Sequence, residues 1–403
     1  MRVIFCNELG EGTGHFAPYL SLLDALAQRG WQVSIAARNP AEAAPASHQR
    51  GFTLFQAPIS TMAFAGLDSA SFSYTEILHH FGYAHEGTLR GLYIAWKNLL
   101  SLTKPDLVLA NAAPTAHLAA QSLGIPVLAV GSGFNCPPAV DPLPLIRDWQ
   151  PGIEARIDAS ENLARRTVDA VLEGFGDSRP GAWKGIYDVP SLLCTLPELD
   201  HFPARGPGAH YIGMLPTSGA AALPVDGPAC DVFVYFRVNQ FIEPLLSDLR
   251  RSGLRTTVYC ADMSQADRTR WRSAGLDMLD RPANLGAILP QCRLVVNYAG
   301  HNLTAETLLA GKPLLLLPVH LEQDLTAQSV VRLGAGLSVR PGERTPRFRR
   351  LLERLLEETA FTDSAAAFAT RYRDWTAERA LGEALTACDE TVASATPRLR
   401  VVQ

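Results

Sequence analysis

Residues 107–126 read LVLANAAPTAHLAAQSLGIP, and residues 294–313 read LVVNYAGHNLTAETLLAGKP. Each stretch begins with an apolar run of strand length, passes through a turn of small residues, and continues at helical spacing to a glycine and a proline. Gly124 and Gly311 stand at the same place in the two stretches, so that a constant offset of 187 residues relates them. This repetition predicts two similar domains, each with the same strand–turn–helix unit.

The residues around these stretches extend the pattern. A short apolar run at 1–6 is followed by the glycine-rich loop NELGEGTGH (7–15), a helix-spaced run, and the second apolar run WQVSIAAR (31–38). Residues 231–260 repeat the alternation of strand, helix and strand. Such alternation is typical of doubly wound parallel sheets. We therefore predict an α/β fold of two Rossmann-like domains, each a doubly wound parallel sheet, that face each other across a cleft.

The domain limits follow from composition. Residues 206–228 are rich in Gly, Pro, Ala and Ser and carry little charge, as expected for a linker. We expect an N-terminal domain at 1–205, a C-terminal domain at 229–380, and the end of a C-terminal helix with a tail at 381–403.

Two segments interrupt the α/β pattern of the first half. Both the region at about 60–100 and that at about 134–190 are rich in aromatic residues or prolines. Insertions of this kind shape a substrate pocket or form a helical cover over the sheet, and the sequence leaves both interpretations open.

Charge and cysteine usage exclude several classes of protein. Lys and Arg number 36 against 40 Asp and Glu, a net charge of −4 that disfavours nucleic-acid partners. The seven cysteines are scattered and contain no CxxC pair, which predicts free thiols and no metal site. No apolar run reaches the ~20 residues that span a bilayer, and the first residues lack a signal peptide's apolar core. We expect a cytoplasmic protein without an integral membrane segment.

The glycine-rich loop argues against a nicotinamide cofactor. The dinucleotide fingerprint GxGxxG requires a glycine where this chain has His15, and Arg38 stands near the position expected for its acidic residue. His15 follows the first strand, where parallel sheets present reactive side chains, so it is a candidate general base. The alternative is a histidine that only caps the following helix.

The turn at Ala299 and Gly300 is a candidate anion site. A helix begins near His301, and a helix N-terminus after a small-residue turn offers unpaired N–H groups to a phosphate, to which the Thr304 hydroxyl can add. An ordinary capped turn is the alternative. Farther on, Glu322 and Gln323 follow another apolar strand, where paired carboxylate and amide groups suit sugar hydroxyls.

Together these residues resemble the GT-B glycosyltransferases, in particular the bacterial branch of the UDP-glycosyltransferase family. The resemblance is carried by GTGHFAPYLSLLDALAQRGWQVSIA (12–36) and NYAGHNLTAETLLAGKPLLLLPVHLEQDLTAQSVVRLGAGLSV (297–339). The ordered set GHxxP, a small-residue turn leading to a glutamate, GKP, EQ and LGAG is more specific than any of its parts. The insertions lie outside the resemblance.

The resemblance implies an inverting, metal-independent transfer of a sugar from a UDP- or dTDP-linked donor to a small-molecule acceptor hydroxyl, with His15 as base and no other cofactor. It makes 1–205 the acceptor-binding domain and 229–380 the nucleotide-sugar-binding domain. In the second of these it places the diphosphate on the turn at 299–304, the ribose near Glu306 and the sugar at Glu322 and Gln323. The nucleobase is expected against 281–284. The full set of implied donor-binding residues is Gly14, Arg237, Arg281, Pro282, Ala283, Asn284, Tyr298, Ala299, Gly300, His301, Asn302, Thr304, Glu306, Glu322 and Gln323.

Two positions depart from the family pattern. Tyr298 replaces a histidine that bonds the donor phosphate, and Arg237 is the residue expected to supply the missing charge. Asn111 replaces the aspartate that orients the catalytic histidine, and an amide orients an imidazole without stabilising its charge. These departures keep one alternative open, a non-catalytic partner protein with this fold. A second alternative is a nucleotide-sugar epimerase or hydrolase on the same fold, which would need no acceptor pocket, and the aromatic insertions count against it.

Overall fold

The chain forms two compact units. The first contains Met1–Thr195, Phe202–Ser218 and Ala377–Gln403, and the second contains Leu196–His201 and Gly219–Thr376. The structure is a computed structural model that describes residues 1–61, 67, 70–147, 151–177, 182–202, 205–206, 208–216, 230–340 and 346–395. Residues 217–228 of the expected linker lie outside these ranges.

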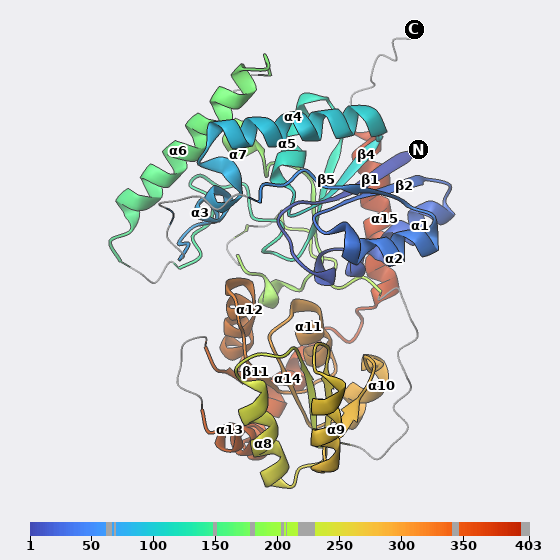
Figure 1. The fold of residues 1–403 in the computed structure, drawn as a ribbon, viewed down its shortest axis with the longest axis vertical. Coiled ribbons are helices and arrows are strands. Elements are labelled where there is room, and N and C mark those ends of the chain that lie inside the picture. The colour runs from blue at the N-terminus through green and yellow to red at the C-terminus, as the bar shows by residue number, and fades with distance from the viewer. Residues whose placement is uncertain are drawn as a thin grey trace. The chain divides into compact units, whose positions relative to one another are not determined.

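The first unit is built on a six-stranded parallel sheet in the order β3-β2-β1-β4-β5-β6 (Figure 1). The strand order reverses between β1 and β4, and side chains at the carboxyl ends of such neighbouring strands are available to a ligand. The strands are β1 (Arg2–Asn7), β2 (Gln32–Ala37), β3 (Thr53–Gln56), β4 (Leu107–Asn111), β5 (Val127–Gly131) and β6 (Ser191–Leu193).

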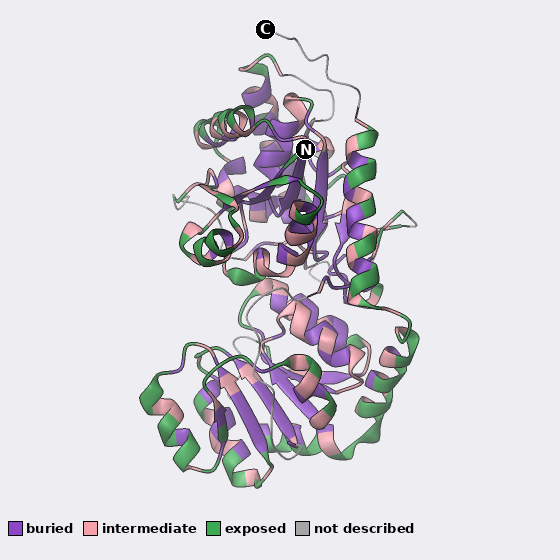
Figure 2. Ribbon diagram, turned by 90° about the vertical axis from the view of Figure 1, so that its right-hand side faces the viewer, coloured by how far each residue is buried: buried purple, intermediate pink, exposed green. Residues whose placement is uncertain are grey.

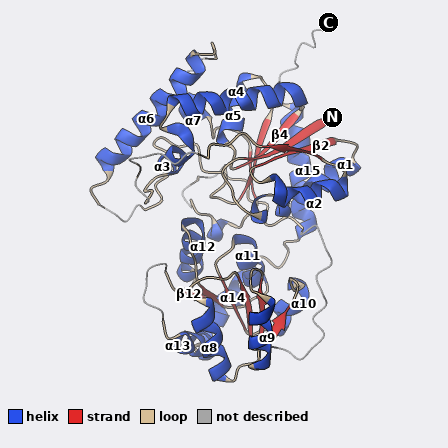
Figure 3. Ribbon diagram, viewed as in Figure 1, coloured by secondary structure: helices blue, strands red, loops and turns tan. Residues whose placement is uncertain are grey.

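Helices flank this sheet (Figure 3). Its strands are apolar on both faces, as expected for a parallel sheet covered on both sides. Both insertions contribute helices, and α4 packs against α5 and α6. The helices are α1 (Leu20–Gln28), α2 (Pro40–Arg50), α3 (Tyr74–Leu78), α4 (Glu86–Thr103), α5 (Pro114–Ser122), α6 (Glu154–Glu173), α7 (Ala182–Gly185) and α15 (Ala377–Ala393), with a π-helical turn at His79–Tyr83.

The second unit has the same topology. Its parallel sheet has the order β12-β11-β10-β7-β8-β9, which read from the other edge is that of the first sheet. The strands are β7 (Val232–Phe236), β8 (Thr256–Cys260), β9 (Asp277–Leu279), β10 (Leu294–Asn297), β11 (Leu314–Leu316) and β12 (Gly336–Ser338). Leu107 begins β4 and Leu294 begins β10, so the internal repeat falls on equivalent strands and the predicted fold class is confirmed.

The helices of the second unit enclose a sheet whose strands are almost entirely buried (Figure 2). α13 shows how they do so: Phe348, Leu352 and Leu355 are buried on one face, while Arg354 on the other pairs with Glu358. The helices are α8 (Ile242–Ser252), α9 (Gln265–Ser273), α10 (Leu285–Ile288), α11 (His301–Leu309), α12 (Leu321–Arg332), α13 (Phe348–Glu357) and α14 (Thr359–Arg371).

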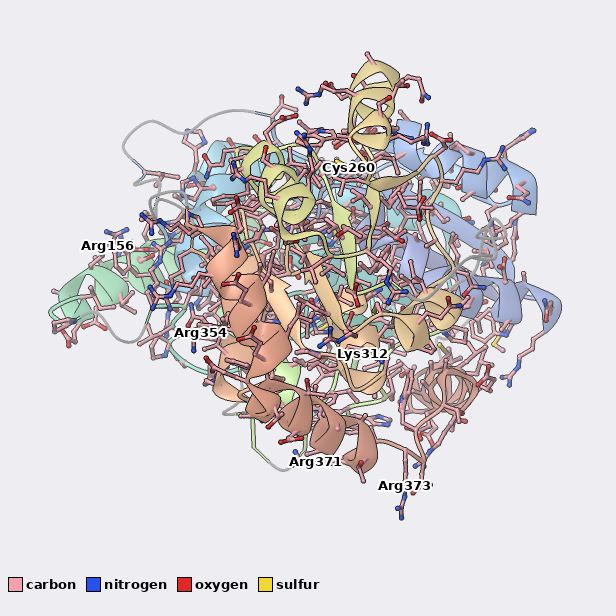
Figure 4. All side chains as sticks on the ribbon, turned by 90° about the horizontal axis from the view of Figure 1, so that it is seen from below. Arg156, Cys260, Lys312, Arg354, Arg371 and Arg373 are labelled. Atoms are coloured by element: carbon pink, nitrogen blue, oxygen red, sulfur yellow. The ribbon has the colours of Figure 1, made fainter. Side chains whose placement is uncertain are left out.

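The compact units differ from the expected domain ranges in two places. Leu196–His201, expected in the first domain, belongs to the second unit because Glu198 pairs with Arg371 and accepts a hydrogen bond from Tyr372. Arg371 is labelled near the end of α14 in Figure 4. Conversely α15, which begins inside the expected second domain, belongs wholly to the first unit. Its apolar face joins the core of that unit and packs against α1, β4 and β5.

No helix among the described residues has both the length and the apolar character to cross a membrane. The seven cysteines all lie in described segments, where they are buried free thiols. No cluster of three His, Cys, Asp or Glu side chains suited to a metal ion occurs in that part of the chain.

The packing of α15 yields a prediction of stability. Ala384 is fully buried in the core of the first unit, so Ala384→Asp places an unpaired carboxylate there and should cost about 3–5 kcal/mol of unfolding free energy. Thr386→Asp on the exposed face of the same helix is the control, with an expected change below about 0.5 kcal/mol. Denaturant unfolding measures both, and equal effects would show that α15 does not pack as described.

Candidate functional site

The loop after β1 fixes the place of His15. Gly12 has a φ of 82°, a left-handed conformation that favours glycine, and it leads into a 3₁₀ turn at Thr13–His15. The imidazole ring lies directly against Gly10, where an added Cβ would come within 2.2 Å of the His15 Cγ. Glycines of this loop therefore allow the half-buried imidazole of His15 to occupy its place. Gly14, expected at the donor, lies in the same turn.

Asn111, the last residue of β4, has an amide whose orientation is fixed. Its Nδ2 donates to the main-chain oxygen of Val130 at 2.8 Å and to the Tyr19 hydroxyl at 3.0 Å. Because a main-chain carbonyl only accepts hydrogen bonds, the nitrogen of the amide must face Val130. The oxygen then faces His15, with Oδ1 at 3.3 Å from Nδ1. The predicted pairing of His15 with Asn111 is thus present in the structure.

A second amide joins this pair. Asn135, in the loop after β5, places its Nδ2 at 3.3 Å from both Asn111 Oδ1 and His15 Nδ1. Gly131 makes room for the contact, because a Cβ there would lie 2.6 Å from the Cβ of Asn135 and 3.0 Å from Asn111 Nδ2. Among the described residues, the side chains that hydrogen-bond His15 are both neutral amides. Sequence analysis missed Asn135, although a polar residue just beyond a strand end was the available signal.

The carboxylate closest in sequence to this group has another role. Glu8 follows β1 and is buried, and it accepts hydrogen bonds from the Thr115 N–H at 2.9 Å and the Thr115 hydroxyl at 2.6 Å. Glu8 therefore binds the first turn of α5, where a negative charge is favourable. Burial nevertheless raises the pKa of Glu8 to about 7. Nothing in these contacts directs its charge to His15.

An aromatic cluster lies beside Asn135 in sequence and is formed from both insertions. The Phe134 ring stacks on Phe202 with centroids 6.4 Å apart, and it meets Tyr74 edge-on at 5.8 Å. Tyr74 also contacts Tyr187 and Phe202. Tyr74, Tyr187 and Phe202 are buried, whereas Phe134 is half-buried. Residues of both insertions, together with Phe202, thus hold one partly exposed ring in a rigid aromatic setting, on the residue that precedes Asn135.

The turn between β10 and α11 in the second unit is the counterpart of the Asn111 turn. Ala299 has a φ of 61°, and Ala112, which stands at the equivalent position of the repeat, has a φ of 45°. Non-glycine residues in this conformation are strained and cluster at functional sites. Asn297 stabilises the turn by accepting from the Ala299 N–H at 2.6 Å.

This turn leaves the start of α11 open to an anion. Gly300 is the N-cap and contributes no side-chain hydrogen bond. Two buried groups close by, the Asn297 amide nitrogen and the Thr304 hydroxyl, have no hydrogen-bond partner among the described residues. Buried polar groups without partners are rare unless a ligand supplies the bond. The structure therefore gives the predicted anion site its donors at Gly300, Thr304 and the intervening His301 and Asn302.

Tyr298 and Arg237 follow the neighbouring strands β10 and β7, and Arg237 acts electrostatically on the Tyr298 hydroxyl. Burial raises the pKa of Tyr298, so its hydroxyl is a neutral donor. Arg237 follows β7, and its exposed side chain pairs with Asp262, Nε to Oδ2 at 3.0 Å. The charge expected to compensate for Tyr298 is therefore present but already has a carboxylate partner. Sequence analysis missed this Asp262 contact, which joins segments 25 residues apart.

The expected nucleobase loop lies between β9 and α10. Asn284 caps α10 by accepting from the Ala287 N–H at 3.3 Å, and Ala283 is buried, whereas Arg281 and Pro282 are exposed. Ala283 packs in one apolar cluster with the partly buried Tyr235 of β7.

Two tyrosines that sequence analysis missed face this region. The rings of Tyr235 and Tyr259 are 5.0 Å apart. Glu306 of α11 acts electrostatically on Tyr235, and burial raises the pKa of the Glu306 carboxyl to about 7. Tyr235 thus packs in the apolar cluster of Ala283 and lies within electrostatic range of Glu306. The signal that could have identified Tyr235 was the alternation of side chains along β7. The residues before and after Tyr235 face one apolar core, so the Tyr235 side chain points away from that core.

At the start of α12, the structure separates the roles of Glu322 and Gln323. Gln323 is buried, and its Oε1 accepts from the Val319 N–H at 2.9 Å, so it holds the loop before α12. Glu322 is more exposed. His201, which sequence analysis did not identify, bonds Thr326 at 3.0 Å, and Thr326 in turn donates to the Glu322 carbonyl. The His201 ring also lies 5.6 Å from that of His301, which links the two helix starts.

Comparison with known proteins identifies the class of this fold. No protein-family model matches the chain. A curated relative, an uncharacterised glycosyltransferase of Mycobacterium leprae, is 35% identical over 88 residues, and the match spans only 19% of that relative and 22% of this chain.

Solved structures match over nearly the whole chain. They include CalG4, the calicheamicin glycosyltransferase, with a TM-score of 0.71 at 17% identity over 98% of this chain and 99% of that one. VinC in complex with dTDP has a TM-score of 0.69 at 18% identity, over 97% and 100%. The spinosyn rhamnosyltransferase SpnG, solved with thymidine diphosphate and also with the spinosyn aglycone, reaches 0.65 at 18% identity over 96% and 100%. The chain has the GT-B fold of these glycosyltransferases, and the resemblance found in the sequence is confirmed at this level.

The contact between Gly10 and His15 yields a prediction about the site. Gly10→Ala should force the imidazole out of its place, because 2.2 Å is far below any contact a Cβ makes. Gly14→Ala is the matched control, since a Cβ there meets nothing within 4 Å. The imidazole NMR signals of His15 should shift strongly in the first variant and little in the second. Unchanged signals in Gly10→Ala would contradict the described loop.

Proposed function

We propose that this protein is an inverting glycosyltransferase that moves a sugar from a dTDP- or UDP-linked donor to a hydroxyl of a small-molecule acceptor, without a metal ion. The GT-B fold and the three similar glycosyltransferases support the reaction type. VinC and SpnG bind thymidine diphosphate, which supports a nucleoside diphosphate here. SpnG also binds an aglycone, which supports a small-molecule acceptor.

The observation that carries the proposal is the fixed orientation of the Asn111 amide. With Oδ1 facing His15, the favourable arrangement has the imidazole proton on Nδ1, donated to Asn111, and a lone pair on Nε2. Asn135 then donates to the same oxygen. A lone pair on Nε2 is what a general base needs to take the acceptor's proton. A histidine that only caps a helix would not require an amide with both ends fixed.

The donor is proposed to bind the second unit. Its diphosphate accepts hydrogen bonds from the first turn of α11, the Thr304 hydroxyl and the Tyr298 hydroxyl, with Arg237 exchanging Asp262 for phosphate. The ribose hydroxyls donate to Glu306, and the base lies along 281–284 with Tyr235. Glu322 binds the sugar. Gln323 holds the loop before α12 in place and so supports the position of Glu322.

His15→Ala tests the role of the base. Transfer should fall by about 10²–10⁴-fold, whereas the affinity for dTDP or UDP should stay within a few-fold because His15 belongs to the acceptor half. Product formation and calorimetric titration measure the two quantities. His80→Ala, at an exposed histidine of the same unit, should change neither. Loss of donor affinity in step with activity would contradict this role.

Glu306 gives the donor site a pH dependence. A ribose hydroxyl binds best to an ionised carboxylate, so Glu306 with its pKa of about 7 must lose its proton when the nucleotide binds. Nucleotide affinity should therefore fall as pH drops below 7, by at most about tenfold per unit. Glu306→Gln should weaken binding at pH 8 and remove this component. Since nucleotide phosphates also titrate, the test is the difference between the two proteins, and identical pH profiles would contradict the assignment.

A further inference from the structure

We infer that the acceptor hydroxyl is an acidic one, a phenol on a flat aromatic molecule, rather than an aliphatic alcohol. The inference rests on the proposed function and goes beyond it by naming the class of acceptor. Two independent observations carry it: the neutral partners of His15, and the aromatic cluster beside one of them.

The two side chains that contact His15 orient its imidazole but carry no charge. Asn111 and Asn135 lie 3.3 Å from Nδ1, and both are amides. When Nε2 accepts a proton, the ring becomes an imidazolium, and a carboxylate partner would stabilise that charge. An amide oxygen offers only a dipole, and here Asn135 already donates to it. The charged form of His15 is therefore poorly stabilised in this group.

A histidine without a carboxylate partner is sufficient when the acceptor loses its proton easily. In the proposed step the acceptor oxygen forms a bond to the anomeric carbon, the bond from that carbon to the diphosphate breaks, and its electron pair leaves with the nucleoside diphosphate. The acceptor's proton goes to His15 Nε2. A phenol has a pKa of about 10, whereas the hydroxyl of an aliphatic alcohol, like that of water, holds its proton far more tightly. Proton transfer from a phenol therefore requires far less stabilisation of the imidazolium.

The aromatic cluster independently favours a flat acceptor. Phe134 immediately precedes Asn135, and it is the half-buried member of a cluster whose other rings are buried. Phe202 and Tyr74 fix the orientation of the Phe134 ring from two sides. A rigid, partly exposed ring offers stacking at low entropic cost. Phe134 immediately precedes Asn135, whose amide contacts His15, so the ring and the His15 group stand on neighbouring residues of one loop.

The test compares two acceptors of nearly equal shape, 2-naphthol and 2-naphthalenemethanol, which differ in the acidity of the hydroxyl. With dTDP-glucose and UDP-glucose as donors, kcat/KM for the naphthol should exceed that for the alcohol by at least about 100-fold, the scale of general-base effects. Three results would overturn the inference: equal rates with the two acceptors, faster transfer to the alcohol, or no transfer to either acceptor while the donor is bound and hydrolysed.

Two variants test whether the amides of Asn111 and Asn135 cause the preference for a phenol. Asn111→Asp and, should that variant fold poorly, Asn135→Asp each place a carboxylate beside Nδ1, and each should narrow the naphthol-to-alcohol ratio at least about tenfold by raising the rate with the alcohol. An unchanged ratio in both folded variants would contradict the argument. Binding of dTDP and UDP by calorimetry separates the two levels: if neither binds, the proposed function fails, whereas a bound donor with the wrong acceptor preference overturns the inference alone.

Discussion

The side chain of Asn111 is the constraint on which the acceptor half depends. Its nitrogen is held by Val130 and Tyr19 through hydrogen bonds of 2.8 and 3.0 Å, so its oxygen must face His15. Gly10 and Gly131 are needed on either side, because a Cβ at the first would meet the imidazole and at the second the amides. The strand ends of β1, β4 and β5 thus combine into one arrangement that presents a single imidazole.

The equivalent turns of the two units differ in the side chains around them. Ala112 after β4 and Ala299 after β10 are equivalent in the internal repeat and share a left-handed backbone conformation. In the first unit the preceding Asn111 contacts His15. In the second unit the turn instead precedes a helix N-terminus that no side chain caps, with two buried donors beside it. The repeat thus provides equivalent strand ends, and in the proposed function one of them orients a base and the other binds an anion.

Sequence patterns predicted the parts of this structure that depend on local regularity. The 187-residue repeat indicated two similar α/β domains, and the resemblance to the glycosyltransferase family implied the pairing of His15 with Asn111 that the structure contains. Contacts between distant segments were not predictable in this way. The docking of Leu196–His201 through Glu198, and of α15 through Ala384, depends on complementary surfaces that no spacing reveals. Asn135 gave a signal at a strand end, but only the structure shows which atoms it meets.

The tautomer of His15 is the quantity that tests the account most directly. In protein labelled with ¹⁵N at histidine, long-range ¹H–¹⁵N correlation at pH 8 distinguishes a protonated ring nitrogen from one with a lone pair, and His15→Ala assigns the signals. The account predicts that His15 carries its proton on Nδ1, facing the Asn111 oxygen, with the lone pair on Nε2. A proton on Nε2, with Nδ1 accepting from Asn135, would contradict the central claim that the Asn111 amide prepares this histidine as a base.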